Sequence, residues 1–534
     1  MRCSISISLV LAGTLAWFPA IADPIAAVPP AVVPASHLPA AAAADSADPV
    51  SLAMGAGYLR AQADGRGGMD RGPLFVLESL ALEGPASFTV DQLGLSGYLG
   101  RPASSAQIQA ISRQVRTYLL NHGHPFAEAS LDFSVREDKP QVDLKIALRP
   151  GAGYKYGGTK QGGSRTRPET LERLALLRYG EDYSEERLRL ALERLSRTGY
   201  FESVVPGTLF RDSTRNLLYP SLALTDFKGN RLGGILGYDS ERKGEGGING
   251  YLDIHLINMR GTARDLDFSF EAKSTGEGPQ EKEARFAYTE PWILGSSLGG
   301  RVDLDIALQD SVYQERNSEF TLFQDISFHS RYSIHFAQQV NRDFAADIRS
   351  TAFSTGLGLR YDARDRVPGT LRGVRFDSKV TGLRRDLGDS SYYLIQGVQT
   401  MGLWTNRGRW VAHLLVSGGG DWPLEERSNR GELFELGGAN TIRGFREKEF
   451  ITNLYLYGNA EIQFLLSPWS RASLFAVPGL VNRLGGDVHW RRVVGYGTGL
   501  EAGGKDWTFG ISYALNPDRN PGDGFLHLRV TNNF

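Results

Sequence analysis

The sequence predicts a β-rich membrane protein in which two small α+β domains precede a transmembrane antiparallel β-barrel of about 16 strands. Three observations support this prediction. The chain begins with the pattern of an export signal, and the residues after position 227 alternate between apolar and polar side chains. No later segment has the roughly 18 consecutive apolar residues that a transmembrane helix needs.

Residues 1–22 have the pattern of a cleavable signal peptide. Arg2 supplies the positive charge, Ile5–Phe18 the apolar stretch, and Ala20–Ala22 the small-residue cleavage site. The only cysteine, Cys3, lies before the apolar stretch, so it is not a lipid-attachment cysteine. We therefore expect an exported mature protein that has neither a disulfide nor a cysteine-ligated metal site.

The composition agrees with an envelope protein built from strands. Glycine is abundant (63 residues), as are Phe (26), Tyr (21) and Trp (8). The formal net charge is −1, so whole-molecule electrostatics gives no reason to expect binding to nucleic acid. Residues 23–72 are rich in Ala, Pro and Gly and are interpreted as a linker. A short plug helix within residues 50–71 is an alternative that their sequence does not decide.

Two small α+β domains are expected next, at residues 73–150 and 151–227. In the first, a strand near Phe75 is followed by a helix that begins at Ser104 or Ser105 and by two further strands. In the second, Ser184 is expected to cap a helix whose first turn carries two glutamates, and two strands close the domain.

The pattern changes from about residue 228 to 534, which we assign to the barrel. Leu304, for example, lies between Asp303 and Asp305, and such alternation continues over about 300 residues. A soluble sandwich would also alternate, but many of these segments have the roughly ten residues that a tilted membrane strand needs. Aromatic residues near predicted strand ends are interpreted as interfacial girdles: Tyr288, Trp292, Trp404 and Trp410.

Three motifs within residues 73–534 resemble those of a known superfamily. The run Ser196–Val204 is similar to the end of a barrel-proximal POTRA module, and Asp362–Gly369 looks like an Asp-x-Arg-Asp…Pro strand-turn motif. Gly438–Phe445 matches the Ile-Arg-Gly-Phe tip of a long sixth extracellular loop. The chain thus resembles the outer-membrane superfamily of the bacterial surface antigen type, in which POTRA modules precede a 16-stranded barrel. Barrel-assembly factors, translocation-and-assembly factors and two-partner-secretion transporters belong to it.

The resemblance implies specific roles for a few residues. The loop is expected to fold into the barrel lumen, where Arg443 would meet an acidic residue of the inner wall, with Glu461 as its partner. The implied site residues fall into three sets: Ile442, Arg443, Gly444, Phe445 and Glu461 for the loop lock; Asp362, Arg364, Asp365, Pro368 and Gly369 for the strand-turn motif; and Phe534 for the C-terminal barrel signal. Val477 stands where the family usually has a second carboxylate, and Asn532 interrupts the apolar face of the last strand.

The sequence contains no motif that predicts an enzyme. A nucleophile elbow, a His-Glu-x-x-His motif and a phosphate-binding loop are all missing from it. His122 and His124 fit a solvated turn better than a metal site, and acidic residues such as Asp303 and Asp305 fit a hydrated barrel wall better than a cation site. We expect neither a catalytic residue nor a metal or cofactor.

The resemblance implies a location in the bacterial outer membrane, with the N-terminal arm in the periplasm. The expected activity is to insert polypeptides into that membrane or move them across it, without nucleotide hydrolysis. The expected partners are polypeptide clients and outer-membrane lipid, with other envelope assembly proteins as further candidates. The first alternative is a two-partner-secretion transporter with one dedicated client; the strand-turn motif and Tyr288–Trp292 favour the assembly branch slightly. The second alternative is a passive diffusion porin.

Overall fold

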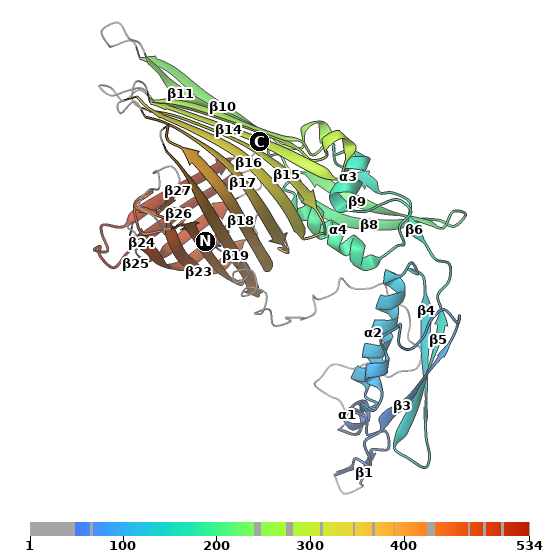
Figure 1. The fold of residues 1–534 in the computed structure, drawn as a ribbon. Helices are drawn as coiled ribbons and strands as arrows, with labels where there is room; N and C mark the ends of the chain where they lie inside the picture. Colours follow the sequence, from blue (N-terminus) through green and yellow to red (C-terminus); the bar gives the residue numbers. More distant parts are fainter. Residues whose placement is uncertain are drawn as a thin grey trace, which may run out of the picture. The chain divides into compact units, whose positions relative to one another are not determined.

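The structure is a computed structural model, drawn as a ribbon in Figure 1. It describes these residues: 49–64, 68–239, 247–273, 281–309, 313–344, 348–365, 369–388, 390–423, 433–467, 470–483, 488–503 and 507–532. The predicted signal peptide and two of the predicted site residues, Pro368 and Phe534, lie outside this description.

The chain divides into two compact units, which do not coincide with the domain boundaries predicted at residues 150 and 227. One unit comprises Met1–Ala81, Ser96–Ile111 and Phe133–Leu144. The other comprises Leu82–Leu95, Ser112–Asp132 and Lys145–Phe534. The boundaries of the two α+β domains therefore stay predictions.

The N-terminal elements include two α-helices, a 3-10 turn, two very short strands and a three-stranded sheet with the order β3–β5–β4. Their bounds are α1 (Pro49–Gly55), β1 (Gln62–Ala63), β2 (Met69–Asp70), β3 (Val76–Glu83), η1 (Ser96–Tyr98), α2 (Ser105–Asn121), β4 (Glu128–Val135) and β5 (Gln141–Arg149). Phe75, Ala103 and Val142 form a small buried cluster. Along α2, Ile111, Val115 and Leu119 recur at helical spacing and are fully buried.

The next module combines two helices with a four-stranded sheet in which β9 is the central strand. Its elements are β6 (Lys155–Tyr156), β7 (Lys160–Gly162), α3 (Pro168–Ala175), α4 (Glu185–Arg197), β8 (Phe201–Asp212) and β9 (Leu217–Asp226). Ser184 caps α4 by accepting a hydrogen bond from the Arg187 backbone N–H, and acidic residues in the first turn favour this helix end. Leu171, Leu195 and Leu218 lie at the centre of its core.

A 16-stranded antiparallel sheet follows, and its strand order is the chain order, so each strand pairs with the next. Its first eight strands are β10 (Arg231–Asp239), β11 (Gly247–Leu256), β12 (Asp265–Lys273), β13 (Glu281–Glu290), β14 (Leu298–Gln309), β15 (Tyr313–Asp325), β16 (Ser330–Asp343) and β17 (Ile348–Asp362). The other eight are β18 (Gly373–Asp386), β19 (Ser391–Arg407), β20 (Trp410–Trp422), β23 (Leu454–Ser467), β24 (Ser470–Arg483), β25 (His489–Gly503), β26 (Trp507–Leu515) and β27 (Phe525–Asn532).

Four shorter elements lie between these strands. Two 3-10 turns, η2 (Met259–Gly261) and η3 (Ile293–Gly295), connect β11 to β12 and β13 to β14. The longest connection, between β20 and β23, contains a small hairpin of β21 (Phe434–Leu436) and β22 (Phe450–Thr452).

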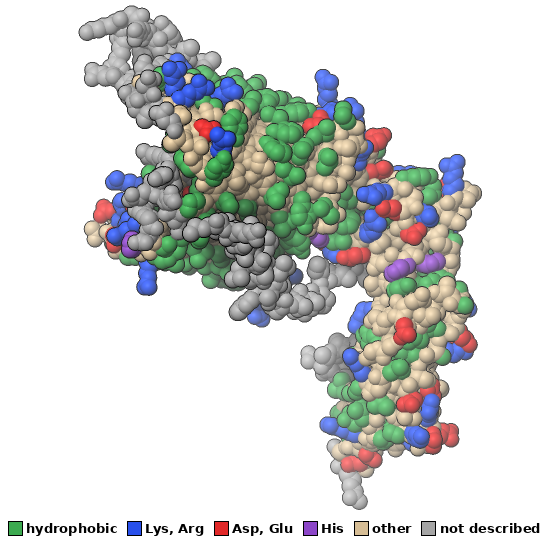
Figure 2. Space-filling view, in the orientation of Figure 1, with side chains coloured by type: hydrophobic (Ala, Val, Ile, Leu, Met, Phe, Trp, Pro, Cys, Tyr) green, Lys and Arg blue, Asp and Glu red, His purple; other side chains and the backbone are tan. Residues whose placement is uncertain are grey.

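The two faces of the 16-stranded sheet differ in chemistry, because side chains alternate along each strand. One face, here called the outer face, exposes large apolar side chains, among them Leu304, Ile334, Leu357, Ile395, Leu414, Leu474 and Leu528. On the side of the molecule that Figure 2 shows, hydrophobic side chains spread over the middle of the strands, while charged side chains gather near the strand ends. The opposite, inner face carries Glu461 and the polar network described below.

Among the residues that the structure describes, no helix has both the length and the apolar character needed to cross a membrane.

Candidate functional site

The segment between β21 and β22, residues 437–449, lies against the inner face of the sheet. Ile442 is fully buried and Phe445 nearly so. Both belong to a cluster with Val477 and Phe475 of β24, Val493 of β25 and Ala514 of β26. The apolar residues that flank the arginine therefore anchor this segment, hereafter the inner loop, to three neighbouring strands.

Arg443, between these anchors, reaches β23. Its Nη2 atom donates to Glu461 Oε2 and to Asn459 Oδ1, each at 2.8 Å. The Arg443 guanidinium carbon lies 3.4 Å from the centre of the Phe475 ring, close enough for a cation–π contact. The Arg443 and Glu461 side chains are only 14% and 13% exposed, so this ion pair is much closer to a buried pair than to a surface pair.

The inner loop extends far along the sheet. Glu461 is seven residues beyond Leu454, the first residue of β23, which corresponds to about 23 Å along the strand. Arg443 thus makes its contacts well inside the sheet rather than at the edge where the loop leaves it.

Two glycines allow the loop backbone to approach the wall this closely. Gly444 has a φ of +93°, and a Cβ atom there would lie 2.3 Å from the Leu515 carbonyl oxygen. A Cβ on Gly495 of β25 would lie 1.6 Å from the Arg443 carbonyl oxygen. Asn516 then fixes the position, because its Nδ2 donates to the Gly444 carbonyl oxygen at 2.6 Å. Only glycine fits at either position without moving the loop.

The structure thus brings together Ile442, Arg443, Gly444, Phe445 and Glu461. Two further partners of Arg443 were not predicted from the sequence: Asn459, which supplies the second oxygen, and Phe475, which supplies the ring. Asn459 could have been found, because it lies two residues before Glu461 and so shares its face of the strand. Val477, at the position where the family usually has a carboxylate, is fully buried and packs in the apolar cluster with Ile442.

The strand-turn motif lies at the connection between β17 and β18. Arg364 pairs with Asp362 at 2.7 Å, and both side chains are largely buried. The Asp365 carboxylate accepts hydrogen bonds from the backbone N–H groups of Leu371 and Arg372, which closes the turn. Gly369 has a φ of +81°, a conformation that favours glycine.

The α4 helix binds to this turn and to the turn between β15 and β16. Arg197 donates to the Arg364 carbonyl oxygen and to the Phe328 carbonyl oxygen, both at 3.0 Å. Arg194 forms an ion pair with Asp325 at 2.6 Å, with side chains 15% and 20% exposed. The strand-turn motif is therefore part of the surface that the module containing α4 contacts.

Other turns at the same ends of the strands complete this surface. Tyr200, which follows α4, donates its hydroxyl hydrogen to Asp265 Oδ2 at 2.8 Å. Burial raises the pKa of Tyr200, so the hydroxyl stays protonated and can donate. Arg173 of α3 donates to the Gly295 carbonyl oxygen at 3.0 Å and lies over the ring of Trp292. We call these contacts of α3, α4 and Tyr200 the arm–turn interface.

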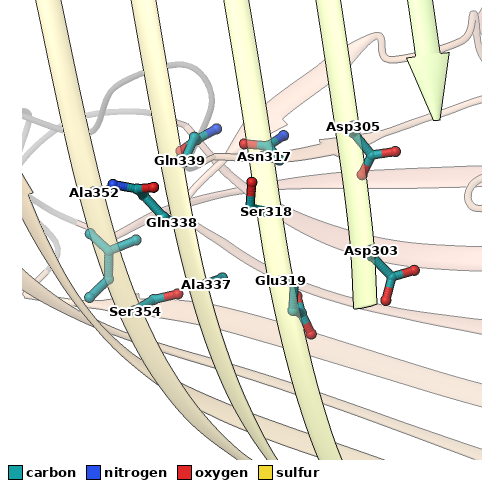
Figure 3. Close-up of a pocket in the computed structure, with 11 residues that line it drawn as sticks. Asp303, Asp305, Asn317, Ser318, Glu319, Ala337, Gln338, Gln339, Ala352 and Ser354 are labelled. Atoms are coloured by element: carbon teal, nitrogen blue, oxygen red, sulfur yellow. The ribbon is translucent and has the colours of Figure 1, made fainter. Parts of the chain in front are cut away.

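The inner face also lines a polar cavity of about 510 Å³ (Figure 3). Asp303 and Asp305 extend into this region from β14, and Asn317 and Glu319 from β15. Glu319 forms an ion pair with Lys379, whose Nζ atom lies 3.1 Å away, and it also hydrogen-bonds to the His335 ring. No group of three or more metal-binding side chains occurs within the described residues.

One sequence interpretation was wrong. Trp404 was assigned to an interfacial girdle, but in the ladder it lies opposite His413, which lies opposite Glu461. Because residues directly opposite each other share a face, Trp404 belongs to the inner face. A shift of one residue would have placed it outside, and its distance from the strand end did not distinguish the two faces.

Comparison with solved structures identifies the fold of this chain. No protein-family model matches the chain, and no curated protein matches it by sequence. CdiB from *Escherichia coli* aligns with a TM-score of 0.53 and 13% identity over 89% of this chain and 92% of that chain. CdiB from *Acinetobacter baumannii* aligns with a TM-score of 0.51 and 14% identity over 87% and 90%.

The chain has the POTRA-plus-barrel fold. This confirms the predicted fold class and the superfamily resemblance at the level of fold. BamA from *Haemophilus ducreyi*, solved without POTRA domains 1–3, also matches, with a TM-score of 0.46 and 15% identity over 86% of this chain and 100% of that chain.

Proposed function

We propose that the chain is an outer-membrane protein that moves polypeptides across that membrane or inserts them into it. The observation that carries the proposal is the combination of an apolar outer face on 16 strands with a soluble arm bound to the turns at one end of them. The apolar face suits lipid, and the arm suits a polymeric client that must be received before it meets the barrel.

The arm offers a way to bind such a client. The strand β8 pairs with β9 on one side, and it has no second partner among the strands that the structure describes. An extended polypeptide can add to such an edge by backbone hydrogen bonds, with little demand on its sequence. Val205 and Phe210 of β8 are exposed and could contribute apolar contact to the added strand.

The inner loop has a role of its own in this proposal. Arg443 and Glu461 hold the loop against the inner wall, where it occupies space that a passing polypeptide needs. Release of the loop would then accompany transport. Asp303, Asp305 and the other polar groups around the cavity provide a hydrated wall for the polypeptide, and no step in this account uses nucleotide hydrolysis or a cofactor.

Two-partner secretion is the second candidate, favoured by the small size of the arm. The described arm contains two helix-and-strand modules, which suits a transporter with one dedicated client. A passive diffusion porin is disfavoured by the same feature, because diffusion through a pore needs no arm. The inner loop packed on the wall also narrows the interior rather than leaving a free channel.

A photo-crosslinking residue at Val205 tests the proposal in cells. We expect ultraviolet light to link β8 to polypeptides in transit, which mass spectrometry would identify. Several outer-membrane barrels among them would indicate insertion, and one large secreted protein would indicate two-partner secretion. Tyr179, which is exposed but lies outside the strands, serves as the control position. Equal capture at both positions, or no polypeptide at Val205, would contradict client binding at this edge.

A further inference from the structure

The inner loop and the strand-turn motif are connected by side chains on the inner face. Trp404 of β19, His413 of β20 and Glu461 of β23 occupy directly opposite positions on three successive strands. The row begins at Arg364, whose guanidinium carbon lies 5.7 Å from the centre of the Trp404 ring, and it ends at Arg443. Each neighbour in this row is therefore within contact range of the next.

His413 is the central member of the row. Its ring lies parallel to the indole of Trp404, with a centroid separation of 4.5 Å and an interplanar angle of 9°. His413 Nε2 is buried and has no hydrogen-bond partner within the part of the chain that the structure describes. Because Nε2 makes no such bond, this nitrogen does not fix the ring, whereas stacking on Trp404 and the neighbouring Glu461 restrain it.

A second set of contacts leads from Glu461 towards the same turn. Glu461 Oε1 accepts a hydrogen bond from Gln463 Nε2, and Gln463 Oε1 accepts one from Arg471 Nη1, both at 2.9 Å. A Cβ atom on Gly369 would lie 3.1 Å from Arg471 Nη2, so Arg471 reaches the strand-turn motif. Glu461 is thus connected to the turn from two sides.

We propose that His413 and Trp404 are positioning residues that hold Glu461 in place for Arg443. Through them, docking of the inner loop depends on the Asp362–Arg364 turn, to which Arg197 of α4 is bound. A movement of the arm would then change how firmly the loop is held. This inference rests on the proposed anchoring role of the loop, although its test requires no client.

Loop docking can be measured by the accessibility of a thiol beneath it. Val477 is fully buried in the cluster that contains Ile442, so Val477→Cys places a thiol under the docked loop. Cys3 lies in the predicted signal peptide, so this thiol would be the only one in the mature protein. The labelling rate of the purified protein with a small polar maleimide then reports the fraction of time for which the loop is undocked.

In the Val477→Cys background, we expect His413→Ala and Arg364→Ala each to speed labelling by about fivefold. The double variant should label no faster than the faster single variant, whereas independent sites would multiply to about 25-fold. His413→Phe keeps a flat ring on Trp404 and should restore slow labelling, which a general loss of structure would not allow. Leu414→Ala, at the exposed outer-face neighbour, is the matched control and should not change the rate.

A parental labelling rate in His413→Ala would overturn the proposal, and so would a 25-fold effect in the double variant. Electrophoretic mobility before and after heating shows whether each variant has formed its barrel. If His413→Ala does not assemble, His413→Asn takes its place, because it removes the stacked ring and retains a polar group. Client transport is measured separately, so failure of this connection and failure of the transport function give different results.

Discussion

At the scale of single residues, Arg443 is held by a carboxylate, an amide oxygen and an aromatic ring. These partners come from two strands, so they fix the orientation of the arginine side chain and also compensate its charge. Glu461 is the only one of the three that carries a formal charge, and it shares the burial of the arginine. Removing either charged partner leaves the other largely buried without its counter-charge.

We predict that Arg443→Ala and Glu461→Ala each undock the inner loop, at a cost of about 3 kcal/mol for a nearly buried pair. The double variant should be little worse than either single variant, since both remove the same interaction. Thiol labelling of Val477→Cys measures the effect on the loop, and client secretion or insertion measures the effect on function. A silent Glu461→Ala beside a severe Arg443→Ala would show that Asn459 and Phe475 are sufficient.

Gly495→Ala gives a test that removes no charge. The added methyl group would meet the Arg443 carbonyl oxygen at 1.6 Å, so the loop backbone must move away from β25. We expect thiol labelling at least about tenfold faster than in the parent, because the overlap with backbone has no simple relief. Gly397→Ala on β19 is the control, as its Cβ would meet only Gln399 Nε2, at 3.7 Å. Slow labelling in Gly495→Ala would mean that the loop does not pack there.

The sequence predicted only some members of this site. Arg443 and Glu461 were identified because the loop motif is distinctive and the glutamate is close in sequence. His413 and Trp404 were not, because their proximity to Glu461 depends on the register between strands that are far apart in the chain. Register follows from the pairing of whole strands, and a short motif does not contain it.

At the scale of elements, α4 connects the arm to the barrel. Its buried stripe, with Ala191 and Leu195, faces the module core, while Arg194 and Arg197 extend from its last turns to the strand turns. The cap at Ser184 and the apolar stripe were predictable, because both depend on local spacing. The ion pair with Asp325 joins residues 131 positions apart, and no sequence signal indicated it.

We predict that Arg194→Ala weakens the arm–turn interface by about 3 kcal/mol, since Asp325 would lose a largely buried partner. Arg331 also contacts Asp325, so part of the charge would stay compensated. Limited proteolysis at rising temperature should show the module that contains α4 cleaved at lower temperature. Arg189→Ala on the same helix removes pairs with Glu186 and Glu193 whose side chains are 30% to 48% exposed, and it should cost less than about 0.5 kcal/mol. Equal sensitivity of both variants would refute a special role for Arg194.

At the scale of the whole molecule, the barrel was predicted from alternation together with the length of the segments and the aromatic residues near their ends. The count of about 16 strands agrees with the 16 strands found, because spacing of strand plus turn is regular over a long segment. The inner loop packed on the wall could be expected only from the resemblance, since its own residues have a turn-like composition.

Because the barrel is expected to be closed, we predict that the protein changes its electrophoretic mobility when it is heated. Native barrels resist unfolding by detergent, so the unheated protein should migrate faster on a gel than the boiled protein. The comparison requires membrane extracts solubilised without heating. Identical mobility before and after boiling would argue against an assembled transmembrane barrel.

In the proposed function, the arm receives a polypeptide that the barrel then transports or inserts. Deletion of residues 73–225 tests whether the arm is needed, provided that heat-modifiable mobility shows an assembled barrel in the membrane. We predict that client secretion or insertion is lost while the barrel remains. Client transport at the full-length rate by the arm-less barrel would contradict the account and favour a passive pore.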